Sequence, residues 1–207
     1  MFRSLIVHCK IWLSWFYPWS LTNQLNELCR HGPDTIDTTV NIIELAARGA
    51  NYGTQTLSCI WQPIHSACYR GHAVILKTLL NLGADGNAFA SDKRTPLMTV
   101  LAFNEFDNDE CAYVLLQHGV DLECQTEQDG FTALHLAVIY KRVSIVNTLL
   151  IAGADMDIAD KWGKTPLQYI STSLMNETDA LIEVEFEKCS NHRMKDYVSQ
   201  WKRCSYL

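Results

Sequence analysis

Residues 129–155 read DGFTALHLAVIYKRVSIVNTLLIAGAD, and this stretch determines how the chain folds. Thr132 precedes a short apolar run that ends at Lys141 and Arg142, where the chain turns. The next run ends at Gly153 and has apolar residues at the i, i+3, i+4 and i+7 spacing of one helix face. Glycine ends helices because it tolerates the left-handed conformation best. The stretch therefore predicts two short helices joined by a tight turn.

The same pattern recurs along the chain at intervals of about 33 to 37 residues. Proline follows three of the helix starts, and it suits the first helical position because its missing N–H has no helical partner there. The starts are Gln62, Thr95, Thr132 and Thr165, and the helix-ending glycines are Gly83, Gly119 and Gly153. A period of this length predicts a repeat protein in which each unit is one supersecondary element.

The Thr-Pro-Leu-His-type starts, the Gly71-His72 turn and the Gly-Ala-Asp endings together resemble the ankyrin repeat. The resemblance implies an all-α fold, an ankyrin-repeat solenoid of helix-turn-helix units joined by β-turn fingers, with helical caps at both ends. We expect this domain over residues 21–187, with three clear central units and degenerate first and last units. The first unit would place helices at residues 21–30 and 40–48, the second followed by the Gly-Ala-Asn ending at residues 49–51.

Two positions depart from the family pattern. Lys93 and Ile60 stand where the family usually has the glycine of the β-turn. Because residues with a side chain disfavour positive φ, we expect these two turns to be distorted.

The segments at either end of the repeats differ in character. Residues 4–19 read SLIVHCKIWLSWFYPW, which is too short and, with His8 and Lys10, too polar for a membrane span. Trp12, Trp15 and Trp19 recur at helical spacing, so residues 1–20 are expected to form a capping helix on the neighbouring repeat, with an interfacial membrane anchor as the alternative. Residues 188–207 are expected to be a helical tail. Helices at 177–187 and 192–203 would shield the last repeat.

Composition excludes several classes of function. The chain has 17 Lys and Arg against 23 Asp and Glu, a net charge of -6, so we expect no nucleic-acid binding. Its 8 cysteines include no Cys-x-x-Cys pair, which indicates reduced thiols rather than zinc or redox sites. We therefore expect an intracellular protein, cytoplasmic or alternatively nuclear, and no metal or cofactor.

No constellation of residues indicates catalysis. His65 and His135 occupy the same position in their repeats, where the resemblance implies that the imidazole ties adjoining turns together. Neither has a base or an orienting partner at a recognisable spacing. Asp85, Asp121 and Asp155 each follow a helix-ending glycine, in a turn where aspartate commonly accepts backbone hydrogen bonds. We expect a protein that is not an enzyme.

The variable positions of the repeats carry the strongest functional signal. The resemblance implies that turn tips and the exposed side of the first helices form a concave, partner-binding surface. Aromatic and arginine side chains are enriched at binding hot spots. The predicted partner-binding residues are Trp61, Tyr69, Arg70, Arg94, Phe131, Ile139, Tyr140, Trp162 and Lys164. Asp92, Phe89 and Phe103 share this surface, and the two phenylalanines are expected to pack between adjacent turns instead.

These features predict a non-enzymatic, monomeric scaffold or adaptor that binds another protein through the concave face. One alternative is a substrate-recognition adaptor of a ubiquitin ligase, because residues 25–30, LNELCR, resemble a ligase-recruiting helical box. The stretch precedes the repeats, however, and no Leu-Pro-Leu-Pro follows it. A second alternative is a docking or regulatory arm of a membrane-associated protein. The apolar N-terminus is the feature that suggests it.

A modification is also predicted. Leu79, Asp85 and Asn87 match a pattern that an asparaginyl hydroxylase recognises in repeats of this kind, with Gly86 where an aliphatic residue is more usual. We therefore expect Asn87 to be a hydroxylation site.

Overall fold

The computed structural model describes residues 18–52, 62–103, 109–170 and 177–190, with side chains from Leu21 onward. Over these residues the fold is a row of helix pairs and contains no strand. In chain order the elements are α2 (Pro18–His31), α3 (Ile36–Ala47), α4 (Pro63–Arg70), α5 (Ala73–Asn81), α6 (Pro96–Ala102), α7 (Asp109–Gln117), α8 (Ala133–Ile139), α9 (Val143–Ala152), the 3-10 turn η1 (Pro166–Tyr169) and α10 (Glu177–Ser190).

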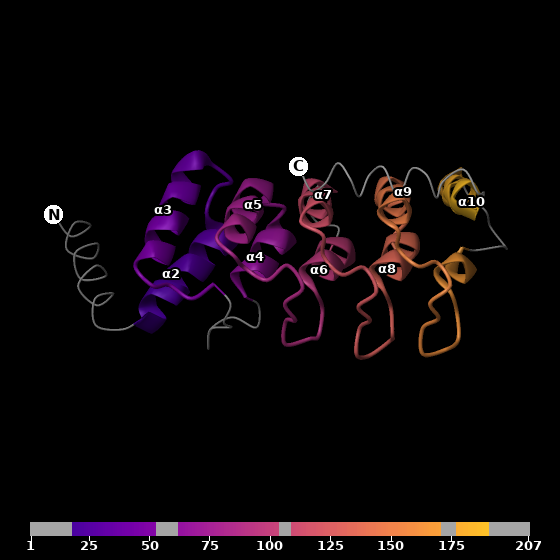
Figure 1. Ribbon diagram of the computed structural model, residues 1–207, viewed down its shortest axis with the longest axis horizontal. Coiled ribbons are helices and arrows are strands. Elements are labelled where there is room, and N and C mark those ends of the chain that lie inside the picture. Colours follow the sequence, from indigo (N-terminus) through magenta and orange to yellow (C-terminus); the bar gives the residue numbers. More distant parts are fainter. Residues whose placement is uncertain (1–17, 53–61, 104–108, 171–176, 191–207) are drawn as a thin grey trace.

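The helix pairs stack side by side into an elongated solenoid. The first helices α2, α4, α6 and α8 lie in one row and the second helices α3, α5, α7, α9 and α10 in another (Figure 1). Loops project from the row of first helices as fingers. We call these finger A (residues 85–95), finger B (121–132) and finger C (155–165). The expected all-α solenoid is confirmed.

Each helix packs against the equivalent helix of the next unit. The first helices contact one another in the order α4, α6, α8, and the second helices do so in the order α5, α7, α9. Leu79, Leu115 and Leu149 occupy equivalent positions on the second helices and are fully buried. Each unit therefore buries its apolar face only on its neighbours, as repeat architectures do.

The predicted start and stop signals of the helices are confirmed. The side-chain oxygens of Thr95 and Thr132 accept hydrogen bonds from the backbone N–H three residues later. Gly83, Gly119 and Gly153 have φ values of 93°, 69° and 92°. These glycines take the left-handed conformation that closes a helix.

Aspartates at the base of the fingers hold both their own turn and the next unit. The Asp85 carboxylate accepts from the backbone N–H of Asn87, 2.8 Å away, and the same bond recurs at Asp121 and Asp155. The Asn87 side-chain oxygen in turn accepts from the backbone N–H of Asp121 at 2.8 Å. Glu123 accepts from the backbone N–H of Asp155 at 2.9 Å in the same way. These aspartates act in turns, as predicted.

The prediction of a distorted turn at Lys93 is wrong. Lys93 adopts a φ of 61°, and its N–H donates to the carbonyl of Ala90 at 2.9 Å. The equivalent bond at Gly163 closes finger C. A single residue with a side chain takes this conformation at a cost of about 1–2 kcal/mol, which the surrounding hydrogen bonds offset. The turn that would contain Ile60 lies outside the described residues.

The end units differ from the prediction in detail. The helix α3 begins at Ile36 rather than residue 40, because Thr35 caps it with a hydrogen bond from the N–H of Thr38. The last unit has only the short turn η1 as its first helix. Its second helix, α10, packs on α9 and buries Ile182 and Phe186. The predicted helix at 192–203 lies outside the described residues.

One helix start is incompletely capped. Gln62 makes no side-chain cap at α4, and Nδ1 of the buried His65 has no hydrogen-bond partner among the described residues. At the equivalent place in α8, the Thr132 hydroxyl lies 2.9 Å from Nδ1 of His135.

We expect Gln62→Thr to supply both missing bonds and raise the free energy of unfolding by about 1 kcal/mol. Thermal melts would measure a Tm increase of about 2–4 °C. Gln62→Val is the matched control, since valine has the shape of threonine without the hydroxyl. An equal gain from both variants would contradict the capping explanation.

Candidate functional site

A cavity of about 140 Å³ is lined by residues of finger A, finger B and the helices α6 and α8. Its apolar lining comes from Phe131, Leu136 and Tyr140 and from Ala102 at the end of α6. Polar and charged groups of the two fingers surround this lining, namely Asp92, Arg94, Thr126, Gln128 and Asp129. We call this feature the finger groove. Apolar contacts with a few convergent polar groups are typical of a binding site.

Aromatic side chains continue from the finger groove toward finger C. Phe131 packs against Trp162, with ring centroids 5.7 Å apart, and against Tyr169 at 5.5 Å. Tyr140, which lines the groove beside Phe131, is 43% exposed, and Trp162 is 62% exposed. Phe131 therefore contacts Trp162 and shares the groove with Tyr140, and the side chains of Tyr140 and Trp162 are accessible. We call these three residues the aromatic row.

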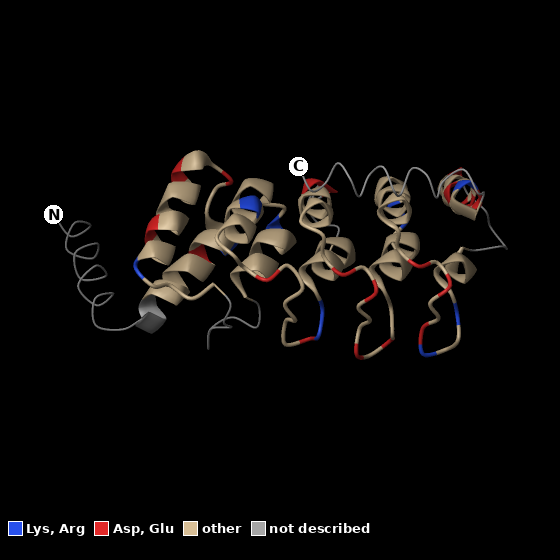
Figure 2. Ribbon diagram, in the orientation of Figure 1, with Lys and Arg blue, Asp and Glu red and all other residues tan. Residues whose placement is uncertain are grey.

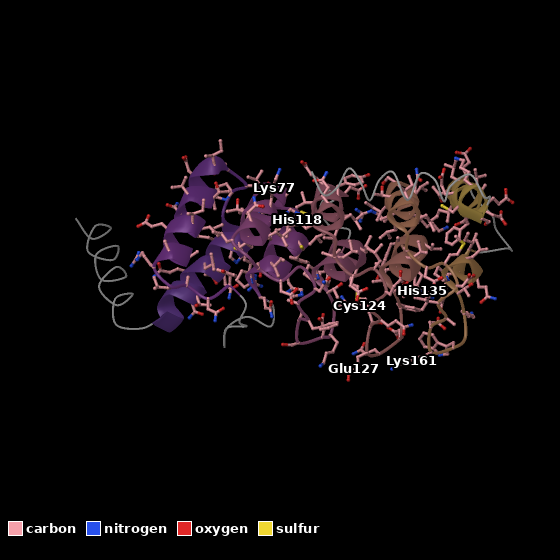
Figure 3. The ribbon with its side chains drawn as sticks, viewed as in Figure 1. Lys77, His118, Cys124, Glu127, His135 and Lys161 are labelled. Atoms are coloured by element: carbon pink, nitrogen blue, oxygen red, sulfur yellow. The ribbon has the colours of Figure 1, made fainter. Side chains whose placement is uncertain are left out.

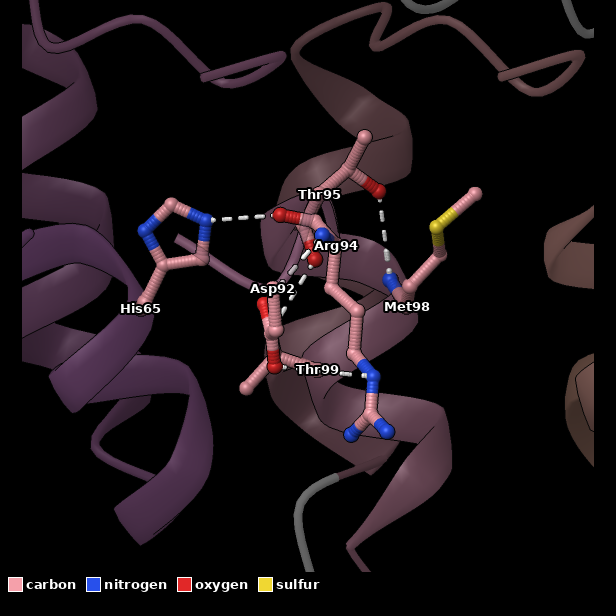
Figure 4. Close-up of polar contacts among 6 residues, drawn as sticks. All are labelled: His65, Asp92, Arg94, Thr95, Met98 and Thr99. Atoms are coloured by element: carbon pink, nitrogen blue, oxygen red, sulfur yellow. Dashed lines mark hydrogen bonds and ion pairs between the residues drawn. The ribbon is translucent and has the colours of Figure 1, made fainter. Parts of the chain in front are cut away.

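The two basic residues predicted to flank this surface have different surroundings. The Arg94 side chain lies 3.6 Å from the Asp92 carboxylate (Figure 4). Its guanidinium stands over the ring of Phe103. Lys164 is exposed, with its ammonium group over the ring of Tyr169. The charge of Arg94 is thus partly neutralised within the fold, whereas that of Lys164 faces solvent.

Buried imidazoles fix the fingers to the helices. Nε2 of His65 donates to the Arg94 carbonyl at 3.2 Å (Figure 4). Nε2 of His135, which is labelled in Figure 3, donates to the Lys164 carbonyl at 3.1 Å. Both side chains are fully buried, and burial lowers the pKa of each. Each ring is neutral at pH 7 and links one unit to the finger of the next, which is the tie that the resemblance implied.

Adjacent finger tips also touch. The Lys161 ammonium donates to the backbone carbonyl of Glu127 on finger B (Figure 3). Acidic and basic side chains both occur along the fingers (Figure 2). Gln125 of finger B adds hydrogen bonds to the carbonyls of Gly130 and Ala159, at 2.7 and 3.0 Å. Fingers B and C are therefore joined at the tip as well as at the base.

The other predicted site residues are spread along the same side. Tyr69 packs edge-on against Phe103 at 5.0 Å, so Phe103 is packed between units as expected, and Tyr69 is half-buried with it. Arg70 and Ile139 are half-buried at the ends of α4 and α8. The expectation that Phe89 packs between turns is wrong, because about half of its surface is exposed. Trp61 lies outside the described residues.

Sequence reasoning missed several residues that line the groove. Thr126, Gln128, Asp129, Leu136 and Ala102 were not predicted. Leu136 follows the tethering histidine directly, and Gln128 and Asp129 form the tip of finger B. The fixed spacing of Gln128, Asp129 and Leu136 from the helix start at Thr132 is the sequence signal that could have identified these three residues.

The cysteines in the described part of the chain are poor nucleophiles. Burial raises the pKa of the Cys111 thiol to about 12 and that of Cys68 well above its ordinary value. Cys124, half-buried beside Asp121, has its pKa raised to about 11. Across the described residues, no group of three or more His, Cys, Asp or Glu side chains is arranged to hold a metal ion.

The helix pairs, their period and the fingers indicate one repeat family, and comparison of the sequence with family models gives the same answer. The model for ankyrin repeats (three copies) matches residues 29–125, 64–160 and 100–182. The chain belongs to the ankyrin-repeat family. Ankyrin repeats are protein–protein interaction modules, so binding of another protein is the activity that this architecture supports.

Known proteins align with most of the ankyrin repeats. The chain is 31% identical to ankyrin repeat and SOCS box protein 5 of Oryctolagus cuniculus over 59% of this chain and 36% of that protein. It is 28% identical to SH3 and multiple ankyrin repeat domains protein 2 of Homo sapiens over 80% of this chain and 9% of that protein. It is 29% identical to neurogenic locus notch homolog protein 2 of Homo sapiens over 86% of this chain and 7% of that protein. The chain thus spans 36% or less of these relatives.

None of the helices in the described ranges is both long enough and apolar enough to cross a membrane. The predicted capping or anchoring segment, residues 1–20, has no described side chains.

Two buried histidines and one half-buried histidine make the stability of the ankyrin repeats depend on pH. Burial lowers the pKa of His65, His72 and His135 in the folded state, so below the unfolded value near 6.5 the unfolded chain binds more protons. Stability is therefore fully present above about pH 6.5 and falls as the pH drops from there toward the lowered pKa values. We expect a lower Tm at pH 5 than at pH 7.5.

The matched control for this pH dependence comes from the last unit. Gln168 replaces the histidine at that position and accepts from the N–H of Thr165 at 2.9 Å. The double variant His65→Gln and His135→Gln is therefore expected to lose less Tm between pH 7.5 and 5 than the native chain. An unchanged loss of Tm would show that other groups cause the dependence.

Proposed function

We propose that this ankyrin-repeat protein is a non-enzymatic, monomeric scaffold or adaptor that binds one partner protein at the finger groove and the aromatic row. The observation that carries the proposal is the accessibility of Tyr140 and Trp162 beside a cavity with apolar and polar lining, on the side from which the fingers project. Large aromatic side chains bury much area at low entropic cost, which makes them frequent binding hot spots.

The size of the finger groove favours a protein partner over a small ligand. Its volume of about 140 Å³ is well below the roughly 300–1,000 Å³ of typical small-molecule sites. A space of this size accommodates one anchoring side chain of a larger partner. The exposed Trp162 and Tyr140 would cover the residues on either side of that anchor.

The charges around the site favour a partner segment with an apolar anchor and acidic residues near finger C. Lys164 is exposed there, and its ammonium group lies over the ring of Tyr169, with no carboxylate of the described residues paired to it. Arg94 is already close to Asp92. Rim charges of this kind act mainly on the association rate and its salt dependence.

We expect the double variant Tyr140→Ala and Trp162→Ala to weaken partner binding by about 2–4 kcal/mol, provided both are hot spots. The fold should persist because neither side chain is in the inter-repeat core. The measurement is a calorimetric titration with the partner identified by crosslinking in cells, alongside a thermal melt.

The control is the pair Leu181→Ala and Val184→Ala, which are exposed on α10 in the row of second helices. These substitutions should leave the affinity unchanged. Lys164→Glu should lower the association rate and reduce its salt dependence. Unchanged affinity in a folded Tyr140 and Trp162 double variant would place the binding site elsewhere on the chain.

The alternative of a ubiquitin-ligase adaptor has support from similarity to a protein whose name includes a SOCS box. The box-like stretch at residues 25–30 argues against it, because Leu25 and Cys29 are fully buried within α2. A buried helix face offers no surface for ligase subunits. Co-purification with elongin-type subunits would nevertheless support this alternative over a free-standing scaffold.

Asn87 is a proposed hydroxylation site, and its surroundings define the test. Its side-chain oxygen accepts from the N–H of Asp121, so a hydroxylase would act after local opening of finger A. We expect mass spectrometry of the protein from normoxic cells to find a fraction of Asn87 heavier by one oxygen atom. Asn147, on α9 and outside any finger, is the internal control. Unmodified Asn87 throughout would end the proposal.

A further inference from the structure

The helix α3, which is the second helix of the first unit, exposes an apolar stripe along its outer face. Ile36 is 76% exposed, Val40 56% and Ile43 47%, and the exposed Ala47 continues the line. The spacing i, i+4, i+7, i+11 places all four on one helix face. We call these four residues the α3 stripe. In the central units the second helices pack on their neighbours on both sides, whereas nothing among the described residues covers the α3 stripe.

Acidic residues border the stripe. Asp37 and Glu44 are exposed and each lies one position beyond a stripe residue. A helix that covered the stripe would therefore bury apolar side chains and meet two carboxylates at its edge. The matching occupant is apolar and basic.

One segment of the chain has this composition. Residues 1–17, MFRSLIVHCKIWLSWFY, are mostly apolar, contain Arg3 and Lys10 and have no acidic residue. Trp12 and Trp15 recur at helical spacing within it. This segment lies outside the described residues and leads directly into α2 at Pro18.

The connection brings the segment to the correct end of the stripe. The short link between α2 and α3 makes these helices antiparallel neighbours, so the start of α2 lies beside the end of α3. The Thr22 hydroxyl, in the second turn of α2, accepts from the backbone N–H of Asn51, just past the end of α3. A helical segment of seventeen residues would reach about 25 Å, longer than the roughly 18 Å of α3.

We propose that residues 1–17 bind the α3 stripe and close the N-terminal end of the repeat stack as an intramolecular cap. The apolar side chains of the segment cover Ile36, Val40 and Ile43, and Arg3 and Lys10 pair with the bordering carboxylates. The proposal concerns a surface separate from the finger groove, so it stands or falls independently of the partner site.

The test is a mutant cycle in the full chain. The stripe variant is Val40→Gln with Ile43→Gln, and the segment variant is Trp12→Gln with Trp15→Gln. On a bare helix face, glutamine for a β-branched residue is neutral or slightly stabilising, because its helix propensity is higher. On a covered face the same change loses apolar burial, and we expect the Tm to fall by about 5 °C or more.

The two variants should not be additive, because both break the same contact. The combined variant is expected to melt close to the less stable of the two, and Glu44→Lys should lower the Tm in a salt-dependent manner. Val74→Gln, at an exposed position of α5, is the matched control and should leave the Tm unchanged. A neutral stripe variant, or additive losses, would overturn the proposal.

Two other occupants give different results. If a second copy covers the stripe, sedimentation equilibrium will show a dimer that the stripe variant abolishes. If the segment is a membrane anchor, the native chain will float with vesicles of phosphatidylcholine and phosphatidylserine and the segment variant will not. Dimer formation or vesicle binding, without the non-additive loss of Tm in the mutant cycle, would overturn the proposal of an intramolecular cap.

Discussion

Each helix pair of this chain has an apolar face that finds its partner only in the next pair, and the remainder of the structure follows from that constraint. Leu79, Leu115 and Leu149 are fully buried because the second helix of a neighbouring unit lies beside each one. The stack places the fingers in a regular series on one side (Figure 1). The buried histidine tethers and the aspartate turns then set the position of each finger relative to its neighbours.

The sequence predicted the central units well because their signals are local. A threonine at a helix start and a glycine at a helix end determine backbone geometry within one turn, whatever the rest of the chain does. Lys93 shows where local reasoning was insufficient. Its φ of 61° is set by hydrogen bonds on both sides of the turn, which compensate for the absent glycine.

The candidate site was predicted only in part, for a related reason. Tyr140, Phe131 and Trp162 were predicted because aromatic side chains at the variable positions of a repeat can be read directly from the sequence. The groove beside them depends on the distance between two fingers, which no single repeat encodes, so Gln128 and Asp129 were missed. The neutralisation of Arg94 by Asp92 and its contact with Phe103 likewise appear only in three dimensions.

The hydrogen bonds that cross from one finger to the next have a consequence for the thermodynamics of recognition. Asn87 holds the backbone of Asp121, Glu123 holds that of Asp155, and Lys161 reaches the carbonyl of Glu127. Fingers A, B and C are therefore pre-organised before any partner arrives. A rigid surface loses little conformational entropy on association, so a larger share of its contact energy is retained as affinity.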